Sequence, residues 1–298
     1  MDTAYLAQQL LNGLILGSMY ALVAIGFSMI YGIINLINFA HGDILMIGAF
    51  ATLGLLAHLG LPIWAVMIGV IAVGAFCGIL IERIAFRPMR GAPQVTGFIA
   101  SLGISIIIQN LGILLLSAQP RNFSFPPSFL QSVTVSGFSI RVVDLSIIIV
   151  TPLLMAALLY IVHRTKMGVA MRATAENLDV ARLMGVNINR TIAFTFALGS
   201  ALAGIGGLMW GGKFGQIDPL MGFLPGLKSF VAAVIGGVGS IPGAILGGYI
   251  LGMAEVLFVG LLPPIYSSYR DAFVFGSLIV ILLIMPNGIL GKNVEERA

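Results

Sequence analysis

The sequence predicts an all-α protein that crosses a membrane many times. Of its 298 residues, 59% are hydrophobic and only 9% are charged, and the mean hydropathy is +1.07. A soluble domain is about 25% charged, so this chain has too few charges to cover a surface that faces water. Apolar runs of the length needed to span the hydrocarbon of a bilayer recur along the whole chain.

Eight apolar runs have the length of a membrane-spanning helix. They lie at Leu10–Tyr31, Ile44–Leu59, Ile63–Ile81, Val95–Ser117, Leu145–Val162, Thr191–Trp210, Gly243–Leu262 and Ala272–Met285. A ninth apolar stretch, Leu227–Val238, is shorter and is either a short span or a re-entrant segment. Residues 1–298 therefore form a single transmembrane domain.

Basic residues predict the orientation of these spans. Three arginines lie within residues 83–90, and further basic residues lie within residues 163–190. Two spans separate these segments, so both lie on one side, which the positive-inside rule identifies as cytoplasmic. The N-terminus is then outside. A cytoplasmic C-terminus, indicated by Lys292 and Arg297, requires the Leu227–Val238 stretch to cross, and we favour that interpretation over re-entry.

Two loops are long enough to have structure of their own. Residues 118–144 contain several prolines and an alternation of apolar residues around Ser136-Gly137, which predicts a small extracytoplasmic β-hairpin. Residues 163–190 form the longest and most highly charged cytoplasmic loop.

A segment of the charged loop has the pattern of a short amphipathic helix. Ala175, Leu178 and Ala181 fall on one face at helical spacing. Acidic residues in the early turns and a basic residue near the end suit the helix dipole, and a glycine then provides a stop. The segment suits docking on another protein, but an ordinary connecting helix on the membrane surface fits the same pattern. Its candidate contact residues are Glu176, Asp179, Arg182, Leu183 and Gly185.

Polar residues interrupt the apolar pattern at three places. Asn35, Asn38, His41 and Asp43 separate the first two spans. If they lie within the bilayer, they face the protein interior or a transport path, and if they form a loop, they are solvated. Glu255 and Gln109 lie inside predicted spans. The glutamate must be paired, protonated or exposed to water, and we expect the glutamine to hydrogen-bond to a neighbouring helix, as does Asn110 beside it.

Small residues recur every four positions in several spans. Examples are Gly199, Ala203, Gly207 and Gly211, then Ala244, Gly248 and Gly252, and the pairs Gly13/Gly17 and Gly74/Gly78. This spacing places them on one helix face and predicts close packing between helices.

Several classes of function are excluded. The three histidines are scattered, and neither a serine-nucleophile elbow nor metal-ligand spacing occurs. The run Gly236–Ser240 lacks the lysine of a phosphate-binding loop, so it is better interpreted as a break between two membrane segments. We therefore expect no enzyme activity, no metal, no cofactor and no nucleotide site. The net charge of +4 reflects the positive-inside rule rather than binding of nucleic acid.

Motifs along nearly the whole chain resemble the membrane-spanning permease subunits of bacterial branched-chain amino acid ABC importers. They are Asn12-Gly13 with Gly17-Ser-Met-Tyr-Ala-Leu22, Tyr31-Gly32 with Phe39-Ala-His-Gly-Asp43, Ile81-Glu-Arg83 with Arg87-Pro88, Met167-Gly168 with Arg172-Ala173, Ala232-Ala-Val-x-Gly-Gly-Val-Gly-Ser-Ile-Pro-Gly243 and Met285-Pro-x-Gly-Ile-Leu-Gly291.

The resemblance implies a set of partners in the bacterial cytoplasmic membrane. Two related permease subunits pair, two cytoplasmic ATP-binding subunits supply energy, and an extracytoplasmic solute-binding protein delivers leucine, isoleucine or valine. The 176–185 segment lies where such permeases place their coupling helix. It departs from the Glu-Ala-Ala-x3-Gly pattern of many ABC importers, because Asn177 and Leu178 follow Glu176 and the glycine lies further on.

Three other functions remain open, one of which is a passive pore or scaffold subunit that equilibrates its substrate without accumulating it. Similar permeases carry urea, short amides or other amino acids, so the substrate within this group is not fixed by the motifs. An ion-coupled secondary carrier could use His41, Asp43 and Glu255 as a proton relay, but other carboxylates within the spans are scarce.

Overall fold

The structure is a computed structural model that describes residues 3–135 and 138–291. Within these residues, eight helices are long and apolar enough to cross a membrane, which confirms the predicted fold class. They are α1 (Thr3–Ile34), α2 (Ala40–Leu59), α3 (Ile63–Ile81, extended by the π-helical turn Glu82–Phe86), α4 (Gln94–Leu116), α6 (Val142–Arg164), α9 (Ile188–Phe214), α11 (Ile241–Leu261) and α12 (Arg270–Ile284, preceded by the 3-10 turn Pro264–Tyr269).

The remaining elements are short. They are the helices α5 (Pro127–Leu130), α7 (Lys166–Glu176), α8 (Leu178–Leu183) and α10 (Phe223–Gly236), and the strands β1 (Arg121–Asn122), β2 (Ser132–Val135), β3 (Phe138–Arg141) and β4 (Gln216–Ile217). β2 and β3 pair antiparallel, as the alternation in residues 118–144 predicts. Their turn at Ser136-Gly137 lies outside the described residues. β1 pairs with β4, which comes from a distant part of the chain.

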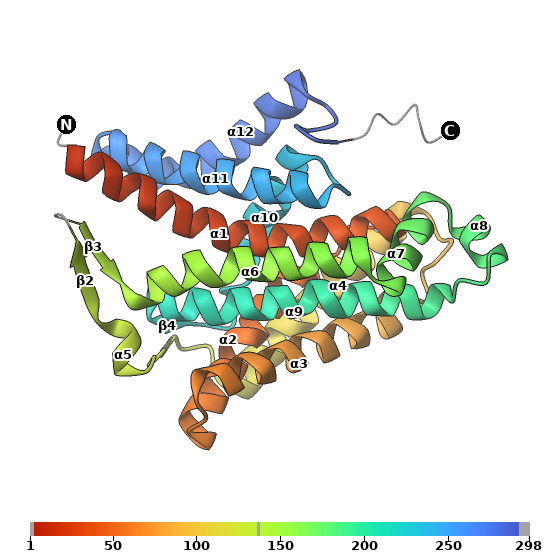
Figure 1. Ribbon diagram of the computed structural model, residues 1–298, viewed down its shortest axis with the longest axis horizontal. Coiled ribbons are helices and arrows are strands. Elements are labelled where there is room, and N and C mark those ends of the chain that lie inside the picture. The colour runs from red at the N-terminus through yellow and green to blue at the C-terminus, as the bar shows by residue number, and fades with distance from the viewer. Residues whose placement is uncertain (1–2, 136–137, 292–298) are drawn as a thin grey trace.

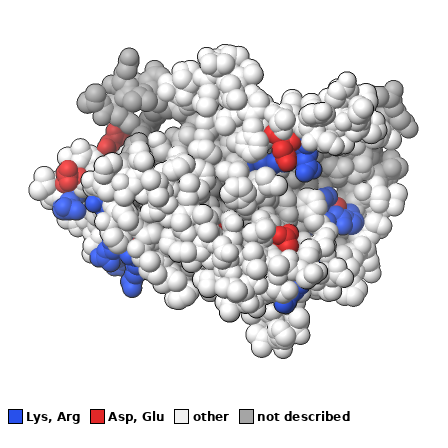
Figure 2. Space-filling view, turned by 180° about the vertical axis from the view of Figure 1, so that it is seen from behind, with Lys and Arg blue, Asp and Glu red and all other residues white. Residues whose placement is uncertain are grey.

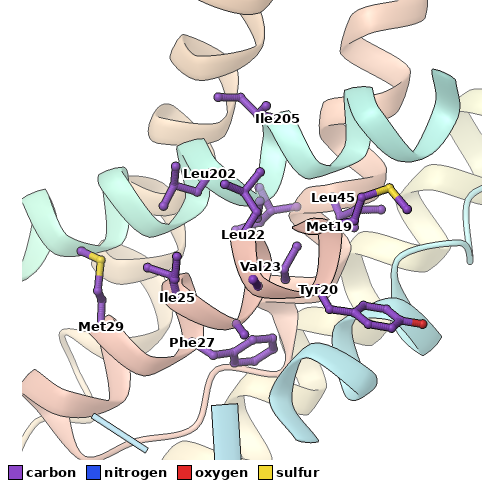
Figure 3. Close-up of a cluster of buried hydrophobic side chains, with 14 of the residues drawn as sticks. Met19, Tyr20, Leu22, Val23, Ile25, Phe27, Met29, Leu45, Leu202 and Ile205 are labelled. Carbon is purple, nitrogen blue, oxygen red and sulfur yellow. The ribbon is translucent and has the colours of Figure 1, made fainter. Parts of the chain in front are cut away.

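Helices α1 and α9 form the centre of the bundle. Both are buried along most of their length, whereas α12 is hardly buried and lies at the edge in Figure 1. Leu22 of α1, Leu45 of α2 and Leu202 of α9 converge in the apolar core (Figure 3). Apolar residues on nearly all sides of α1 explain its position, because a helix that is hydrophobic all round is stable only when it is enclosed.

The small-residue stripes lie where helices approach each other most closely, as predicted. A Cβ added at Gly207 would lie 1.9 Å from the backbone oxygen of Leu45, and one at Gly248 would lie 2.4 Å from Cα of Ala21. A Cβ at Gly252 would lie 2.3 Å from the backbone nitrogen of Gly17. Backbone therefore packs directly on backbone along α1–α11 and α2–α9, which only glycine permits.

The bundle has two distinct ends. We call the end that carries β2 and β3 the hairpin end, and the opposite end, from which α7 and α8 project, the α8 end (Figure 1). Arg90 donates a hydrogen bond to Asn189, at the start of α9. The arginine-rich segment 83–90 and the charged loop 163–190 therefore lie at the same end, as the positive-inside rule requires. Lys292 and Arg297 lie outside the described residues.

Helix α10 has 14 residues and spans about 21 Å at 1.5 Å per residue, so it is too short to cross a bilayer alone. β4, just before it, lies at the hairpin end beside β1. Just after it, the Gly239 nitrogen donates to Ser28 Oγ over 3.0 Å near the end of α1. The chain thus passes from the hairpin end to the α8 end through an irregular segment and a short helix. This agrees with a crossing of the Leu227–Val238 stretch rather than re-entry.

Candidate functional site

The polar segment between the first two spans returns the chain to the interior of the bundle. The imidazole of His41, in the first turn of α2, lies so close to α1 that a Cβ at Gly26 would be 2.3 Å from its Nε2. Its ring also contacts the edge of Phe27, with centroids 4.7 Å apart. Gly26 is in the interior of α1, about two turns before its end at Ile34. Helix α2 therefore starts inside the bundle.

Burial separates the members of this polar group. Asn38, His41 and Asp43 have exposed fractions of at most 1%, whereas Asn35 is exposed and has a positive φ of 52°. The side-chain nitrogens and oxygens of Asn38 and His41 have no hydrogen-bond partner among the described residues. The burial of these three residues favours the membrane-embedded interpretation for them, and the exposure of Asn35 favours the loop interpretation there. Unpaired buried polar atoms cost about 1–3 kcal/mol each.

Gln109 joins this polar group from α4. Its Nε2 donates to Asp43 Oδ1 over 3.0 Å and to Ser105 Oγ over 3.1 Å. The expectation that Gln109 bonds to a neighbouring helix is therefore confirmed. The same expectation for Asn110 was wrong, because its side chain donates to the carbonyl of Ile106 in its own helix. Asn110 faces outward, where its own backbone is the nearest acceptor.

Glu255, in the interior of α11, lies in a network of charged residues. Its carboxylate accepts from Lys228 Nζ at 2.7 Å and from the Tyr20 hydroxyl at 2.9 Å, and it contacts Arg270 Nε at 3.2 Å. Lys228 also contacts Asp271 at 2.7 Å. The glutamate is therefore paired, which was one of the alternatives that the sequence left open.

Sequence reasoning missed Lys228 and Arg270 as functional candidates. Lys228 is the only charged residue of α10 and is 4% exposed. A signal was available, because a lysine within an apolar stretch needs an acidic partner inside the membrane, and Glu255 is an acidic residue in the next span. Arg270 could be found only from the structure, since it lies at the start of α12, where a charge is ordinarily solvated.

The charged loop forms two helices rather than the single predicted helix. α7 ends at Glu176, Asn177 adopts an extended conformation, and α8 begins at Leu178. The prediction was wrong because Asn177 acts as an N-cap, its Oδ1 accepting from the nitrogens of Asp179 and Val180. Glu176 is thus the last residue of α7, and Ala175 and Leu178 belong to different helices. Gly185, with φ of +81°, ends the segment as predicted.

Helix α8 presents apolar side chains to its surroundings. Leu183, its last residue, is 85% exposed, and Leu178 and Val180 are also exposed, as is Met184 just after the helix, at 79%. Only Ala181 of this helix is buried. In Figure 1, α8 projects beyond the ends of the long helices. Asp179 and Arg182 are also exposed, so α8 combines apolar and charged side chains on one projecting surface.

A cavity of about 390 Å³ lies behind α7, at the α8 end. Met171, Arg172 and Glu176 of α7 line one side, and Gly32 of α1 and the segment Val238–Pro242 line the other. Helix α7 therefore shares a cavity with the last turns of α1 and with the break between α10 and α11. That break occurs at the glycine run that the sequence marks.

Comparison with known proteins assigns the chain to a family. Residues 9–283 match the family described as the permease component of branched-chain amino acid transport systems. The chain belongs to this family.

Full-length relatives agree with this membership. The permease protein BraD of a high-affinity branched-chain amino acid transport system from Pseudomonas aeruginosa is 43% identical over 97% of both chains. LivH of Escherichia coli is 42% identical over 98% of both. A probable LivH of Methanocaldococcus jannaschii is 31% identical over 95% of this chain and 91% of its own. No solved structure matches.

Membership of the permease family fixes the class of function. The chain is a multi-pass permease component of the cytoplasmic membrane, and it serves an ABC importer. A more distant relative, the permease protein LsrC of the autoinducer 2 import system of Yersinia pestis, is 27% identical over 78% of this chain and 63% of its own. Within the described residues, His, Cys, Asp and Glu form no group of three that could hold a metal ion.

Proposed function

We propose that this chain forms one half of the transport path of an ABC importer for leucine, isoleucine and valine. A second, homologous permease subunit forms the other half, and two cytoplasmic ATPase subunits drive it. The carrying observation is full-length similarity to high-affinity branched-chain amino acid permeases. An extracytoplasmic binding protein delivers the amino acid.

The hairpin end is the extracytoplasmic end in this proposal, and the α8 end is cytoplasmic. Support comes from the arginines of residues 83–90 and the basic residues of 163–190, which lie together at the α8 end. Residues 118–144 are then the extracytoplasmic loop, available to the binding protein. Residues 163–190 are the cytoplasmic coupling loop.

The ATPase subunit docks on α8. The exposed side chains of Leu183 and Met184 supply apolar contact area, and Asp179 and Arg182 supply charge. Exposed apolar groups rimmed by polar ones are typical of protein interaction sites. Gly185 and Asn177 fix the orientation of α8, since the first ends it and the second caps it.

Helix α7 transmits the movement of α8 to the transport path. It is joined to α8 through the single residue Asn177, and its other face borders the cavity of about 390 Å³ beside α1. Free volume there leaves room for the α7 side chains that border the cavity to move. The glycine-rich break after α10 forms the far wall, so a shift of α7 reaches the ends of α10 and α11.

An ion-coupled carrier is the second candidate, favoured by the buried Asp43 and Glu255. Glu255 contacts two basic side chains, Lys228 and Arg270. These two ion pairs give Glu255 a structural role that needs no proton relay. The structure therefore supports this candidate less well than an ATP-driven permease.

The two candidates differ in their energy source. The chain, reconstituted in proteoliposomes with its permease and ATPase partners and with the binding protein outside, is expected to accumulate leucine only when ATP is enclosed. An uncoupler at constant ATP leaves uptake unchanged. Unlabelled isoleucine and valine compete, and urea and acetamide do not. Accumulation by the chain alone, or loss of uptake with the uncoupler, would contradict the proposal.

A further inference from the structure

A second, larger cavity of about 660 Å³ lies toward the hairpin end, between α1, α9, α10, α11 and α12. Its lining residues include Tyr20, Trp210, Asp218, Lys228, Glu255 and Arg270. Figure 2 shows small groups of adjacent basic and acidic side chains on a face of the molecule that is otherwise nearly free of charge.

The cavity wall has a charged part and an apolar part. On the charged part, Glu255 contacts Lys228 at 2.7 Å and Arg270 at 3.2 Å. The apolar part includes Trp210, which packs against Phe214 with ring centroids 4.7 Å apart, together with aliphatic and thioether side chains of α1, α10 and α11. Such a wall suits a small ligand with a charged head and an apolar side chain.

The charged group is costly for stability. Lys228 and Glu255 are both nearly fully buried, and a buried ion pair is often no more stable than well-packed apolar residues of the same volume. Tyr20 also places its hydroxyl on Glu255, and in Figure 3 its ring points away from the apolar core of α1. Stability of the fold alone therefore explains the buried Lys228–Glu255 pair poorly, whereas a role in binding a ligand explains it well.

The backbone at the cavity also supports a ligand site. The segment between β4 and α10 is irregular, and Asp218, Leu220 and Met221 of this segment line the cavity. At membrane depth, irregular backbone is tolerated only where protein buries it or where it borders a water-filled space. A short helix that starts at such a space leaves polar backbone groups available to a ligand.

The charges around the cavity balance. The charged residues are those that line the cavity and their ion-pair partners. The basic ones are Lys213, Lys228, Arg270 and Arg141, and the acidic ones are Asp218, Glu255, Asp271 and Asp144. A ligand with a net charge would disturb this balance in a poorly solvated place, whereas a zwitterion keeps it.

We propose that this cavity is the amino acid site of the permease, and that Lys228 binds the α-carboxylate of the substrate. This assignment rests on the proposed function. The incoming carboxylate replaces that of Asp271, which is 43% exposed at its side chain on the least buried helix and remains paired with Arg270. Asp218, which forms no salt bridge with any described residue, accepts the ammonium group. Trp210 and its apolar neighbours enclose the aliphatic side chain.

Trp210 makes the proposal directly measurable. The chain has two tryptophans, and the other, Trp64, is 65% exposed on α3 and does not line the cavity. A Trp64→Phe chain in lipid nanodiscs therefore reports from the cavity alone. Its fluorescence is expected to change saturably with L-leucine. Isocaproate, which lacks the ammonium group, and isoamylamine, which lacks the carboxylate, are expected to bind at least about tenfold more weakly, since each loses one of the two charge-assisted contacts that leucine makes.

Variants separate ligand binding from folding. In the Trp64→Phe background, the neutral double variant Lys228→Met/Glu255→Gln removes both charges without leaving one alone, and it is expected to lose the response. Asp218→Asn, at a partly exposed position, is expected to weaken leucine binding at least about tenfold. The matched control is Glu82→Gln/Arg90→Met, which removes an ion pair at the α8 end and is expected to keep the response.

Four outcomes would overturn the assignment. Two concern the Trp64→Phe chain: no saturable response in the folded chain, or equal responses to leucine and to either analogue. The other two concern the variants: the Lys228/Glu255 double variant keeps the response, or the control loses it. A Trp210→Phe chain that still responds would also count against it. If the complete transporter accumulates leucine with ATP while these binding tests fail, this inference alone is wrong. If the binding tests succeed and ATP-driven uptake fails, the proposed function is wrong.

Discussion

Single glycines decide how closely the central helices approach. Gly48 of α2 and Gly204 of α9 lie so close that a Cβ on Gly48 would be 2.3 Å from the Gly204 backbone oxygen. Gly207 faces the Leu45 carbonyl even more closely. By contrast, a Cβ on Gly103 of α4 would meet nothing within 4 Å. The same residue type is thus obligatory at one position and replaceable at another.

Replacing Gly207 by alanine is expected to lower the thermal stability of the purified chain. The added methyl group would overlap backbone, which cannot rotate away as a side chain does, and overpacking of this kind costs about 1–3 kcal/mol. The matched control is Gly103→Ala, which adds the same group in open space and favours the helix by up to about 1 kcal/mol. Stability is measured as the fraction of monodisperse protein that survives heating in detergent. Equal losses in both variants would contradict the packing described here.

Short elements have roles that their length does not suggest. Helix α8 has six residues, too few for a stable isolated helix, and it is held by the Asn177 cap and by the Gly185 turn. Helix α10 is too short to span alone but connects the large cavity to the α8 end. In both cases, the neighbouring irregular residues are as important as the helix itself.

Leu183→Lys, at the tip of α8, is expected to impair ATPase docking while membrane insertion stays intact. The side chain is 85% exposed, so it has little intramolecular packing to lose, and a charge there acts mainly on a partner. Gly185→Asp is expected to act in the same direction, because φ of +81° is strained for a residue with a side chain. Val169→Lys on α7, also exposed, is the matched control.

The measurement is co-purification of the ATPase subunit with the tagged permease, together with leucine uptake. Normal co-purification and uptake in the Leu183→Lys complex would show that α8 is not the coupling helix.

At the scale of the whole molecule, the order of crossings follows from how the helices pair. α11 runs antiparallel to α1, since Met253 of α11 packs on Gly13 whereas Gly239, just before α11, packs on Gly32. The turn Pro264–Tyr269 therefore lies at the hairpin end, and the residues after α12 return to the α8 end, where the Ile289 nitrogen donates to the Ile235 carbonyl.

Labelling with a membrane-impermeant thiol reagent tests this order. The single cysteine, Cys77, is first replaced by serine. Gln119→Cys and Ser267→Cys are then expected to react from outside intact cells, and Asn177→Cys only after permeabilisation. Ser267 is the decisive position, because re-entry of the 227–238 stretch would place it on the cytoplasmic side. All three positions are exposed, so failure to react reports sidedness rather than burial.

Local pattern predicted much of the fold and less of the sites. The spans, the glycine contacts, the hairpin and the glycine stop at Gly185 each depend on a few neighbouring residues, which a sequence displays directly. The helix break at Asn177 was missed because an asparagine within a helical pattern fits either a helix or a cap. The network of Lys228, Glu255 and Arg270 was missed because it joins residues from three helices.

The sequence by itself determined that this chain is a polytopic helical membrane protein and a permease, because hydrophobic length and family motifs are properties of consecutive residues. Only the tertiary structure decided which polar residues are buried together, where α2 starts within the bundle, and where the cavities lie. The physical reason is distance. In a bilayer, the cost of an unpaired charge depends on partners from other helices, and a linear pattern does not show which helices meet.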